Sequence, residues 1–216
     1  MRRFALLMLG FCAALALAQS AEYRNEAAAA YRTILAGLAA KGKLDDDGAL
    51  LARVRRISPG LIAAAAQMRA ETAAWSWEMH VTSDPAKGTF CMAGGKVLVG
   101  AGLVKRLALD DGELAMLLGH EIAHAVADHR RAPSRLTMES DATEERREAA
   151  LALAQEEEAD RIGMQLAHRA GWPAAKLATF FDKLVAQESA GTFSASHPTA
   201  AARAAAAQVV ARTLGD

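Results

Sequence analysis

The sequence predicts a mainly helical α+β domain that contains one small β-sheet, and three observations support this fold class. A length of 216 residues suffices for one hydrophobic core but not for two once a targeting segment is removed. The chain is 52% hydrophobic, yet it holds 53 alanines and only 5% aromatic residues, which favours close-packed helices over a β-sandwich. β-Branched and aromatic residues gather between residues 75 and 100, where we expect the sheet.

The N-terminal residues are typical of a secretory signal peptide. Two arginines follow Met1, residues 4–18 form an apolar run, and the small-x-small pattern at 16–18 suits a cleavage site. The run is shorter than the roughly 20 apolar residues that a membrane span needs. We therefore expect residues 1–18 to be removed on export to the periplasm, which leaves one domain over 19–216. A retained membrane anchor is the alternative.

The first half of the mature chain predicts a helical shell followed by strands. Residues 21–40 favour a helix, the aspartates at 45–47 suit the cap of a second helix, and Ser58-Pro59 suits the start of a third. The segment 75–82 predicts a strand with its two tryptophans on opposite faces. Residues 89–99 contain two apolar runs around Gly94-Gly95, which predicts a hairpin with a two-residue turn.

The second half predicts further helices. Asp110 and Glu113 form a capping box for a helix that we expect to end near His129. The charged segment 130–147 lacks an apolar stripe and is interpreted as an exposed connection. Three more helices are expected, over residues 148–170, 174–187 and 199–213.

An HExxH motif occupies residues 120–124, inside the helix predicted from its capping box. His120 and His124 are one turn apart and roughly 40° around the helix axis, so both imidazoles can reach a single ion. Glu121 stands where its carboxylate can flank a metal without binding it. Because two histidines on an amphipathic helix are also compatible with ordinary buried residues, the motif calls for a third ligand.

A candidate for that ligand lies in the acidic run at residues 156–160 (EEEAD). Glu156 and Asp160 share one helical face, so Glu156 can bind the ion while Asp160 orients a histidine ligand. The other two glutamates point elsewhere on the helix. A solvated acidic run is the alternative for this segment alone. Two separate helices that supply parts of one site favour a catalytic zinc centre.

These motifs resemble the HtpX-like and CAAX-prenyl-protease-like zinc metallopeptidases, a family with periplasmic, Oma-like and β-barrel-assembly-enhancing-protease-like members. The resemblance rests on the HExxH motif, the ExxAD pattern at 156–160, the segment 88–95 (GTFCMAGG), and His197-Pro198 followed by Arg203. In the segment 88–95 the Asn and Pro of the family pattern are replaced. The resemblance implies a zincin-like (gluzincin) fold.

The same resemblance implies a site. It implies one Zn²⁺ per chain, held by His120, His124 and Glu156, with Glu121 as catalytic base. Zinc would acidify water and polarise the scissile carbonyl, and Glu121 would move the proton to the leaving amine. A non-proteolytic chaperone-like or binding module with a structural or silent zinc site is the alternative function.

His197 is a further candidate catalytic residue, because it precedes Pro198 at the expected start of the last helix. A neutral imidazole there can occupy the open zinc position and keep the enzyme latent, or its side chain can stabilise the tetrahedral oxyanion. A simple helix cap is the third interpretation. The three separate by the effect of His197→Ala on activity: a gain, a loss or no change.

Other features indicate a polypeptide partner and argue against nucleic-acid-binding and nucleotide-binding functions. A polypeptide substrate can add as a strand along the edge of the 89–99 hairpin, although a purely structural hairpin is the alternative. Balanced charges (25 Lys and Arg, 25 Asp and Glu) and the lack of Gly-rich phosphate motifs argue against nucleic acid and nucleotides. Peripheral envelope association is compatible with export. Four residues are interpreted as ordinary, namely His80, His129, His168 and a small buried Cys91.

Overall fold

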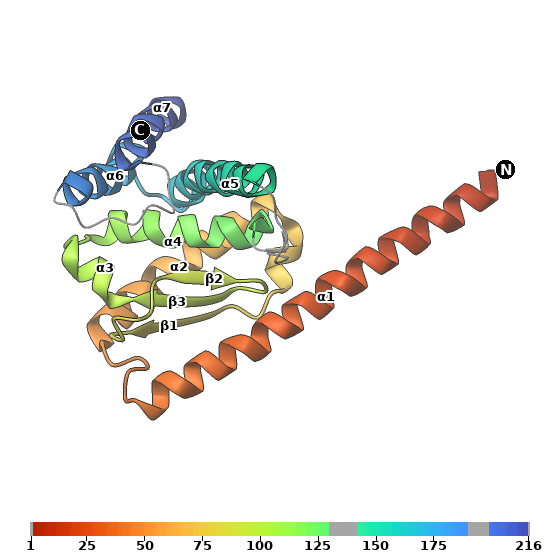
Figure 1. Cartoon of the computed structure of the whole chain (residues 1–216), viewed down its shortest axis with the longest axis horizontal. Coiled ribbons are helices and arrows are strands. Elements are labelled where there is room, and N and C mark those ends of the chain that lie inside the picture. The colour runs from red at the N-terminus through yellow and green to blue at the C-terminus, as the bar shows by residue number, and fades with distance from the viewer. Residues whose placement is uncertain (1, 130–141, 190–198, 216) are drawn as a thin grey trace.

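The computed structural model describes residues 2–129, 142–189 and 199–215. Its core is a small sheet below a central helix, with further helices packed above and behind (Figure 1). This mainly helical α+β arrangement agrees with the fold class that the sequence predicts. The elements are α1 (Arg2–Ala40), α2 (Gly48–Met68), the 3₁₀-helix η1 (Ala70–Ala74), β1 (Glu78–Thr82), β2 (Phe90–Met92), β3 (Lys96–Gly100), α3 (Ala101–Arg106), α4 (Asp111–Val126), α5 (Ala142–Arg169), α6 (Ala174–Ser189) and α7 (Ala200–Leu214).

The sheet has the strand order β1-β3-β2, so β3 is central and fully buried. β2 and β3 pair antiparallel, which confirms the hairpin, whereas β1 and β3 pair in parallel. The expected two-residue turn is wrong, because Met92 pairs with Lys96 and leaves three residues in the loop. Gly94 and Gly95 both have positive φ (80° and 78°), a conformation that glycine adopts without steric cost.

The two tryptophans before β1 also differ from the prediction. Trp75 ends η1 and Trp77 precedes the strand, so neither belongs to the alternating pattern of β1. Their ring centroids are 5.4 Å apart, which places the two rings against each other rather than on opposite faces. The segment therefore forms an aromatic pair at the sheet's end.

Helix α2 continues through Pro59, so the expected start of a third helix at Ser58 is wrong. The Ser58 hydroxyl instead donates to the Val54 carbonyl at 2.7 Å. Buried apolar residues recur at helical spacing on both sides of the proline, from Val54 to Leu61. Their burial outweighs the local cost of the missing backbone donor, which is about 3 kcal/mol in an unsupported helix.

Helix α4 is the central element of the fold and is buried along its length. It contacts α2, α5, α6 and β2, and Gly112 to Val126 are all buried. The predicted capping box is present: the Asp110 carboxylate accepts from the Gly112 and Glu113 amides, and Glu113 accepts from the Asp110 amide at 2.9 Å. Glu113 is 1% exposed and also accepts hydrogen bonds from Thr179 and Lys183 of α6.

Helix α5 crosses α4 at a pair of glycines. A Cβ placed on Gly163 would lie 2.6 Å from the His120 amide nitrogen, and one on Gly119 would lie 2.6 Å from the Gly163 carbonyl oxygen. Only hydrogen atoms in place of side chains allow the two backbones to approach this closely. The crossing brings the residues that precede Gly163 on α5 against the HExxH segment of α4. α5 begins at residue 142, earlier than the predicted 148.

Helix α1 packs its C-terminal part against the sheet and extends away from the domain towards the N-terminus (Figure 1). The buried Tyr31 hydroxyl donates to the Val97 carbonyl of β3. Tyr31, Leu38 and Leu98 form a second small core that holds the helix on the sheet. Within the described residues, we find no helix with the length and apolar character needed to cross a membrane.

Candidate metal centre

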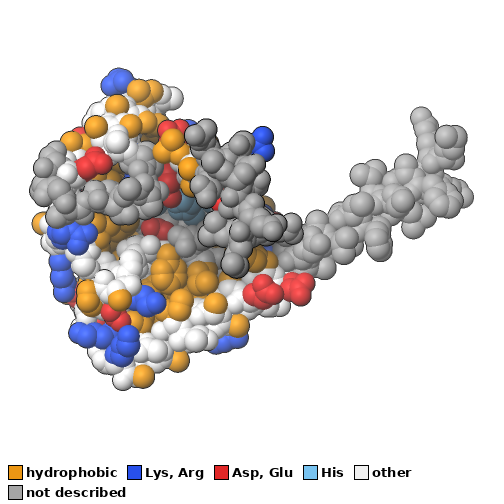
Figure 2. All heavy atoms as spheres, in the orientation of Figure 1, with side chains coloured by type: hydrophobic (Ala, Val, Ile, Leu, Met, Phe, Trp, Pro, Cys, Tyr) orange, Lys and Arg blue, Asp and Glu red, His pale blue; other side chains and the backbone are white. Residues whose placement is uncertain are grey.

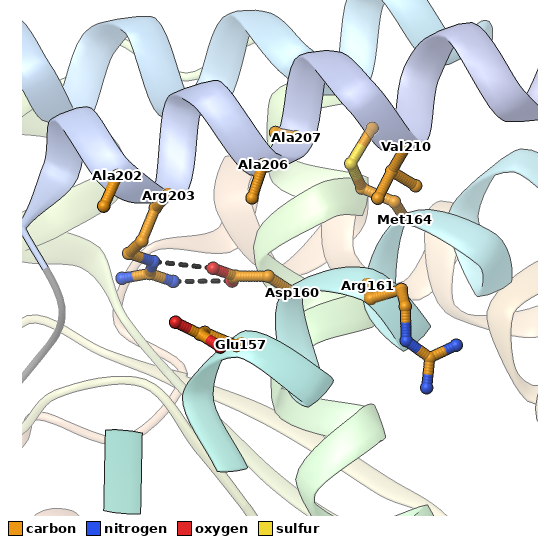
Figure 3. A pocket seen from close by; sticks show the side chains of 9 residues that line it. All are labelled: Glu157, Asp160, Arg161, Met164, Ala202, Arg203, Ala206, Ala207 and Val210. Carbon is orange, nitrogen blue, oxygen red and sulfur yellow. Dashed lines mark hydrogen bonds and ion pairs between the residues drawn. The ribbon is translucent and has the colours of Figure 1, made fainter. Parts of the chain in front are cut away.

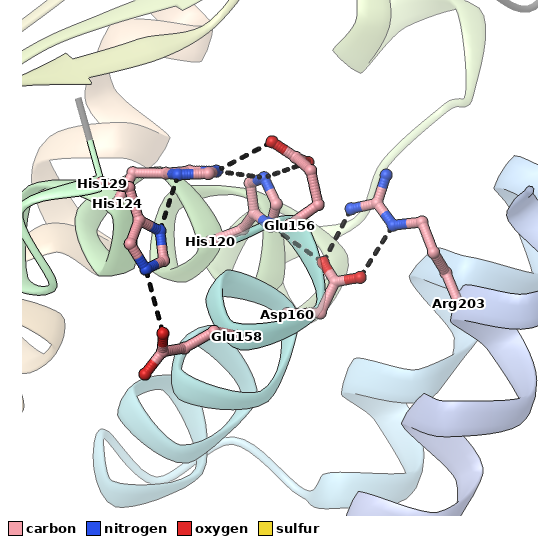
Figure 4. Close-up of polar contacts among 7 residues, drawn as sticks. All are labelled: His120, His124, His129, Glu156, Glu158, Asp160 and Arg203. Carbon is pink, nitrogen blue, oxygen red and sulfur yellow. Dashed lines mark hydrogen bonds and ion pairs between the residues drawn. The ribbon is translucent and has the colours of Figure 1, made fainter. Parts of the chain in front are cut away.

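Three side chains from α4 and α5 converge at the glycine crossing. His120 and His124 come from one face of α4, and Glu156 comes from α5 (Figure 4). One ligand atom of each residue lies within 4.8 Å of the other two. Two of the three residues are buried and Glu156 is half-buried. These are the three residues that the sequence predicts as ligands.

The spacing of the three ligand atoms suits a tetrahedral metal. The two histidine Nε2 atoms are 3.2 Å apart, and the Glu156 carboxylate oxygens lie 3.3 Å from His124 Nε2 and 3.5 Å from His120 Nε2. Ligand bonds of about 2.0 to 2.2 Å in a tetrahedron place neighbouring ligand atoms about 3.3 to 3.6 Å apart. Two imidazoles and one carboxylate are also the donor set of catalytic zinc sites that keep a position open.

Asp160 holds His120 from behind. His120 Nδ1 lies 2.8 Å from Asp160 Oδ1, and Arg203 of α7 donates to both oxygens of this carboxylate at 2.7 Å. Figure 3 shows this pair at the end of a small pocket between α5 and α7 whose walls are mostly apolar. Burial alone would raise the pKa of Asp160, but the bonds from Arg203 and His120 hold it below its ordinary value. Asp160 is therefore an anionic acceptor for the His120 N–H.

His120 itself is kept neutral by its surroundings. Burial lowers its pKa below the ordinary value, and this effect exceeds the opposing influence of Asp160. A neutral imidazole with its proton on Nδ1 presents the lone pair of Nε2 towards Glu156 and His124. This is the form in which histidine binds a metal.

His129 is not the ordinary histidine that the sequence suggested. Its Nδ1 lies 3.1 Å from His124 Nδ1, and its Nε2 lies 3.2 Å from Glu158 Oε2 (Figure 4). Glu158 therefore points to the site, contrary to the expectation from helical geometry. His129 follows the end of α4, where no helical spacing applies, so the sequence gives no signal for this contact. His80 instead contacts Asp45, and Cys91 is buried in β2 as expected.

A cavity of about 290 Å³ opens over the three ligand candidates. Glu121, which is 8% exposed, lines it beside the histidines. Thr89, at the start of the hairpin, lines another part. Apolar side chains from α3, α4 and α6 complete the wall: Leu103, Leu117, Phe180 and Leu184. Figure 2 shows histidine and acidic side chains at the bottom of a hollow on this face. His197 lies outside the described residues.

Comparison with known proteins finds a similar family over the part of the chain that contains the site. Residues 50–141, which include the HExxH motif, match the model of peptidase family M48. This family uses zinc, and His120, His124 and Glu156 are a group within the described residues that can hold the ion.

The chain is also similar to several mitochondrial proteins over a short stretch. The chain is 43% identical over 54 residues to "Mitochondrial metalloendopeptidase OMA1" of Arabidopsis thaliana and 47% identical over 53 residues to the protein of that name from Schizosaccharomyces pombe. It is 43% identical over 54 residues to "Metalloendopeptidase OMA1, mitochondrial" of Bos taurus. These matches cover 24 to 25% of this chain and 10 to 15% of the relatives' own length.

Proposed function

We propose that the chain is a zinc-dependent endopeptidase that hydrolyses peptide bonds in polypeptide substrates. The observation that carries this proposal is the group of His120, His124 and Glu156 at tetrahedral spacing, with the Glu121 carboxylate in the same cavity. A purely structural zinc site has no use for a carboxylate that flanks the metal, and it typically has four protein ligands rather than three. The names of the relatives point to the same class of reaction.

Each residue has a defined role in this proposal. His120, His124 and Glu156 hold the zinc, and Asp160 fixes the orientation and tautomer of His120. Bound zinc supplies a Lewis acid that polarises the scissile carbonyl and acidifies water. Glu121 accepts the proton of the attacking water and transfers it to the leaving amine. His120, Glu121 and His124 are buried, and charge interactions are stronger in such surroundings than in water.

The sheet edge and the cavity wall suit an extended peptide. β2 is an edge strand of the sheet, and Thr89 at its start borders the cavity. A substrate that pairs with β2 would enter the cavity as an added strand. The apolar wall formed by Leu103, Leu117, Phe180 and Leu184 would then receive an apolar side chain next to the scissile bond. A zincin-like (gluzincin) arrangement of helix and edge strand is part of this proposal.

The remaining proposals concern location and domain limits. Residues 1–18 act as a signal peptide, residues 19–216 form one metallopeptidase domain, and the mature protein works in the periplasm on envelope proteins that need removal. The basic start and apolar run of the first 18 residues support this assignment. N-terminal sequencing of exported protein tests it, with Gln19 expected as the first residue.

The experiment for the activity compares wild type with Glu121→Gln on unfolded casein, with bound zinc measured in parallel. We expect Glu121→Gln to retain zinc and to lose cleavage by about 100- to 10,000-fold, because the amide cannot accept the proton. Glu157→Gln, an exposed change on α5, is the matched control and should cleave at the wild-type rate. Zinc binding without Glu121-dependent cleavage of any substrate would favour the non-proteolytic module.

A further inference from the structure

The two histidines of the HExxH motif have different partners at their Nδ1 atoms. His120 Nδ1 contacts the carboxylate of Asp160, whereas His124 Nδ1 contacts the imidazole of His129 at 3.1 Å. On its far side His129 Nε2 contacts Glu158 Oε2 at 3.2 Å. His129 is 8% exposed, so this imidazole is a buried polar group between two partners. The contacts form a row from Glu158 through His129 to His124 (Figure 4).

Only one placement of protons satisfies this row when His124 binds a metal. His124 Nε2 faces the other ligand atoms, so its lone pair is used there and its proton must be on Nδ1. That N–H donates to His129 Nδ1, which must then be unprotonated and act as acceptor. The His129 proton is consequently on Nε2, where it donates to the Glu158 carboxylate. Every donor in the row thus has an acceptor.

The chain around His129 is shaped to place it there. α4 ends at Val126, and Asp128 takes a positive φ of 58°, which turns the backbone back towards the helix. Arg69 fixes this turn, since its Nη1 donates to the Val126 carbonyl at 2.5 Å and to the Asp128 carboxylate at 2.9 Å. A left-handed residue costs free energy unless the surrounding structure supports it. The support from Arg69 makes the position of His129 a feature of the fold.

We propose that His129, backed by Glu158, is a positioning residue that holds His124 in its metal-binding tautomer and orientation. The inference rests on the proposed ligand set. In this inference His129 accepts the Nδ1–H hydrogen bond of His124, as Asp160 accepts that of His120. The acceptor is a neutral imidazole instead of a carboxylate. Glu158 is 48% exposed and also lies 3.7 Å from Arg161, so its contribution is smaller than that of the buried His129.

The test measures zinc affinity by competition with a chromophoric chelator on the full mature chain. His129→Asn and His129→Leu form a matched pair of similar shape, because the Asn Oδ1 can accept the His124 N–H and the Leu methyl cannot. We expect His129→Leu to lower zinc affinity roughly 10- to 100-fold and His129→Asn to stay within about threefold of wild type. The visible spectrum of the Co²⁺-substituted protein should change in His129→Leu and remain close to wild type in His129→Asn.

Glu158→Ala is expected to lower zinc affinity severalfold, and Glu157→Ala, its exposed neighbour, should leave it unchanged. Wild-type affinity in His129→Leu would overturn the inference, and equal losses in the Leu and Asn variants would show that the ring acts by packing rather than as an acceptor. Equal affinities in Glu158→Ala and Glu157→Ala would remove Glu158 from the row. A wild-type chain that binds no zinc would instead overturn the proposed ligand set itself.

Discussion

Replacement of Gly163 by alanine tests whether the helix crossing sets the geometry of the metal centre. The added methyl would lie 2.6 Å from the His120 amide nitrogen and 2.8 Å from the His120 Cα. These atoms belong to backbone and cannot rotate away. α5 must therefore move from α4 by about 0.8 Å to restore ordinary contact near 3.4 Å.

The magnitude follows from two opposing effects. Overpacking against rigid neighbours costs about 2 to 3 kcal/mol, whereas alanine in a helix gains about 1 kcal/mol over glycine. The net loss of about 1 to 2 kcal/mol corresponds to a fall in Tm of about 2 to 8 °C for a chain of this size. A shift of 0.8 Å also exceeds the tolerance of about 0.2 Å on metal–ligand distances, so zinc affinity should fall about tenfold or more.

The control is Gly37→Ala, an exposed position within α1 where the added methyl meets no atom within 4 Å. There the helix propensity acts alone, and we expect a rise in Tm of about 1 to 4 °C with unchanged zinc affinity. Thermal denaturation followed by circular dichroism measures both variants. A Gly163→Ala protein as stable as wild type, with wild-type zinc affinity, would refute the argument from close approach.

Two further predictions address the site and the fold. Glu156→Ala should lose zinc and activity while Glu157→Ala keeps both, because the neighbouring position points about 100° away on the helix. Metal analysis and casein cleavage measure the two effects. Equal losses in both variants would contradict the assigned helical register. The hydrogen bond from Lys105 holds the pKa of Asp47 below its ordinary value, so its contribution to stability is present above about pH 4 and is lost as pH falls through the lowered pKa. Asp47→Asn keeps the cap of α2 but should lower the free energy of unfolding by about 0.5 kcal/mol at pH 7. Urea titrations should show this difference shrinking as pH falls below about 4. A difference that stays constant with pH would show that charge is not the cause.

The sequence predicts those parts of the molecule that local chemistry determines. The capping box at Asp110 and Glu113 and the hairpin before α3 each depend on residues a few positions apart. The metal group is predictable because HExxH and ExxAD carry fixed helical spacings. Each of these patterns is local in the chain, although the two metal motifs that meet in the structure are 32 residues apart.

The missed features at Pro59, at His129 and in the pairing of β1 depend on contacts between distant segments. Pro59 stays inside α2 because the burial of neighbouring side chains compensates the local cost of the proline. β3 pairs not only with its hairpin partner β2 but also, in parallel, with the more distant strand β1. His129 acquires its role from Glu158, 29 residues later, and from a backbone turn that Arg69 fixes. The sequence pattern of one segment does not indicate which distant residues it will contact.

The buried Glu113 has a consequence for how the domain opens. Helix ends usually fray first, since opening them costs little free energy, and their amides therefore exchange with solvent. Here the carboxylate that caps α4 also accepts a hydrogen bond from Lys183 on α6 at 2.6 Å, so the first turn of α4 cannot unwind without breaking contact with another helix. The start of α4 and the packing of α6 therefore belong to one cooperative unit. The helix that carries the candidate ligands His120 and His124 is therefore held in place by a hydrogen bond from its first turn to a neighbouring helix.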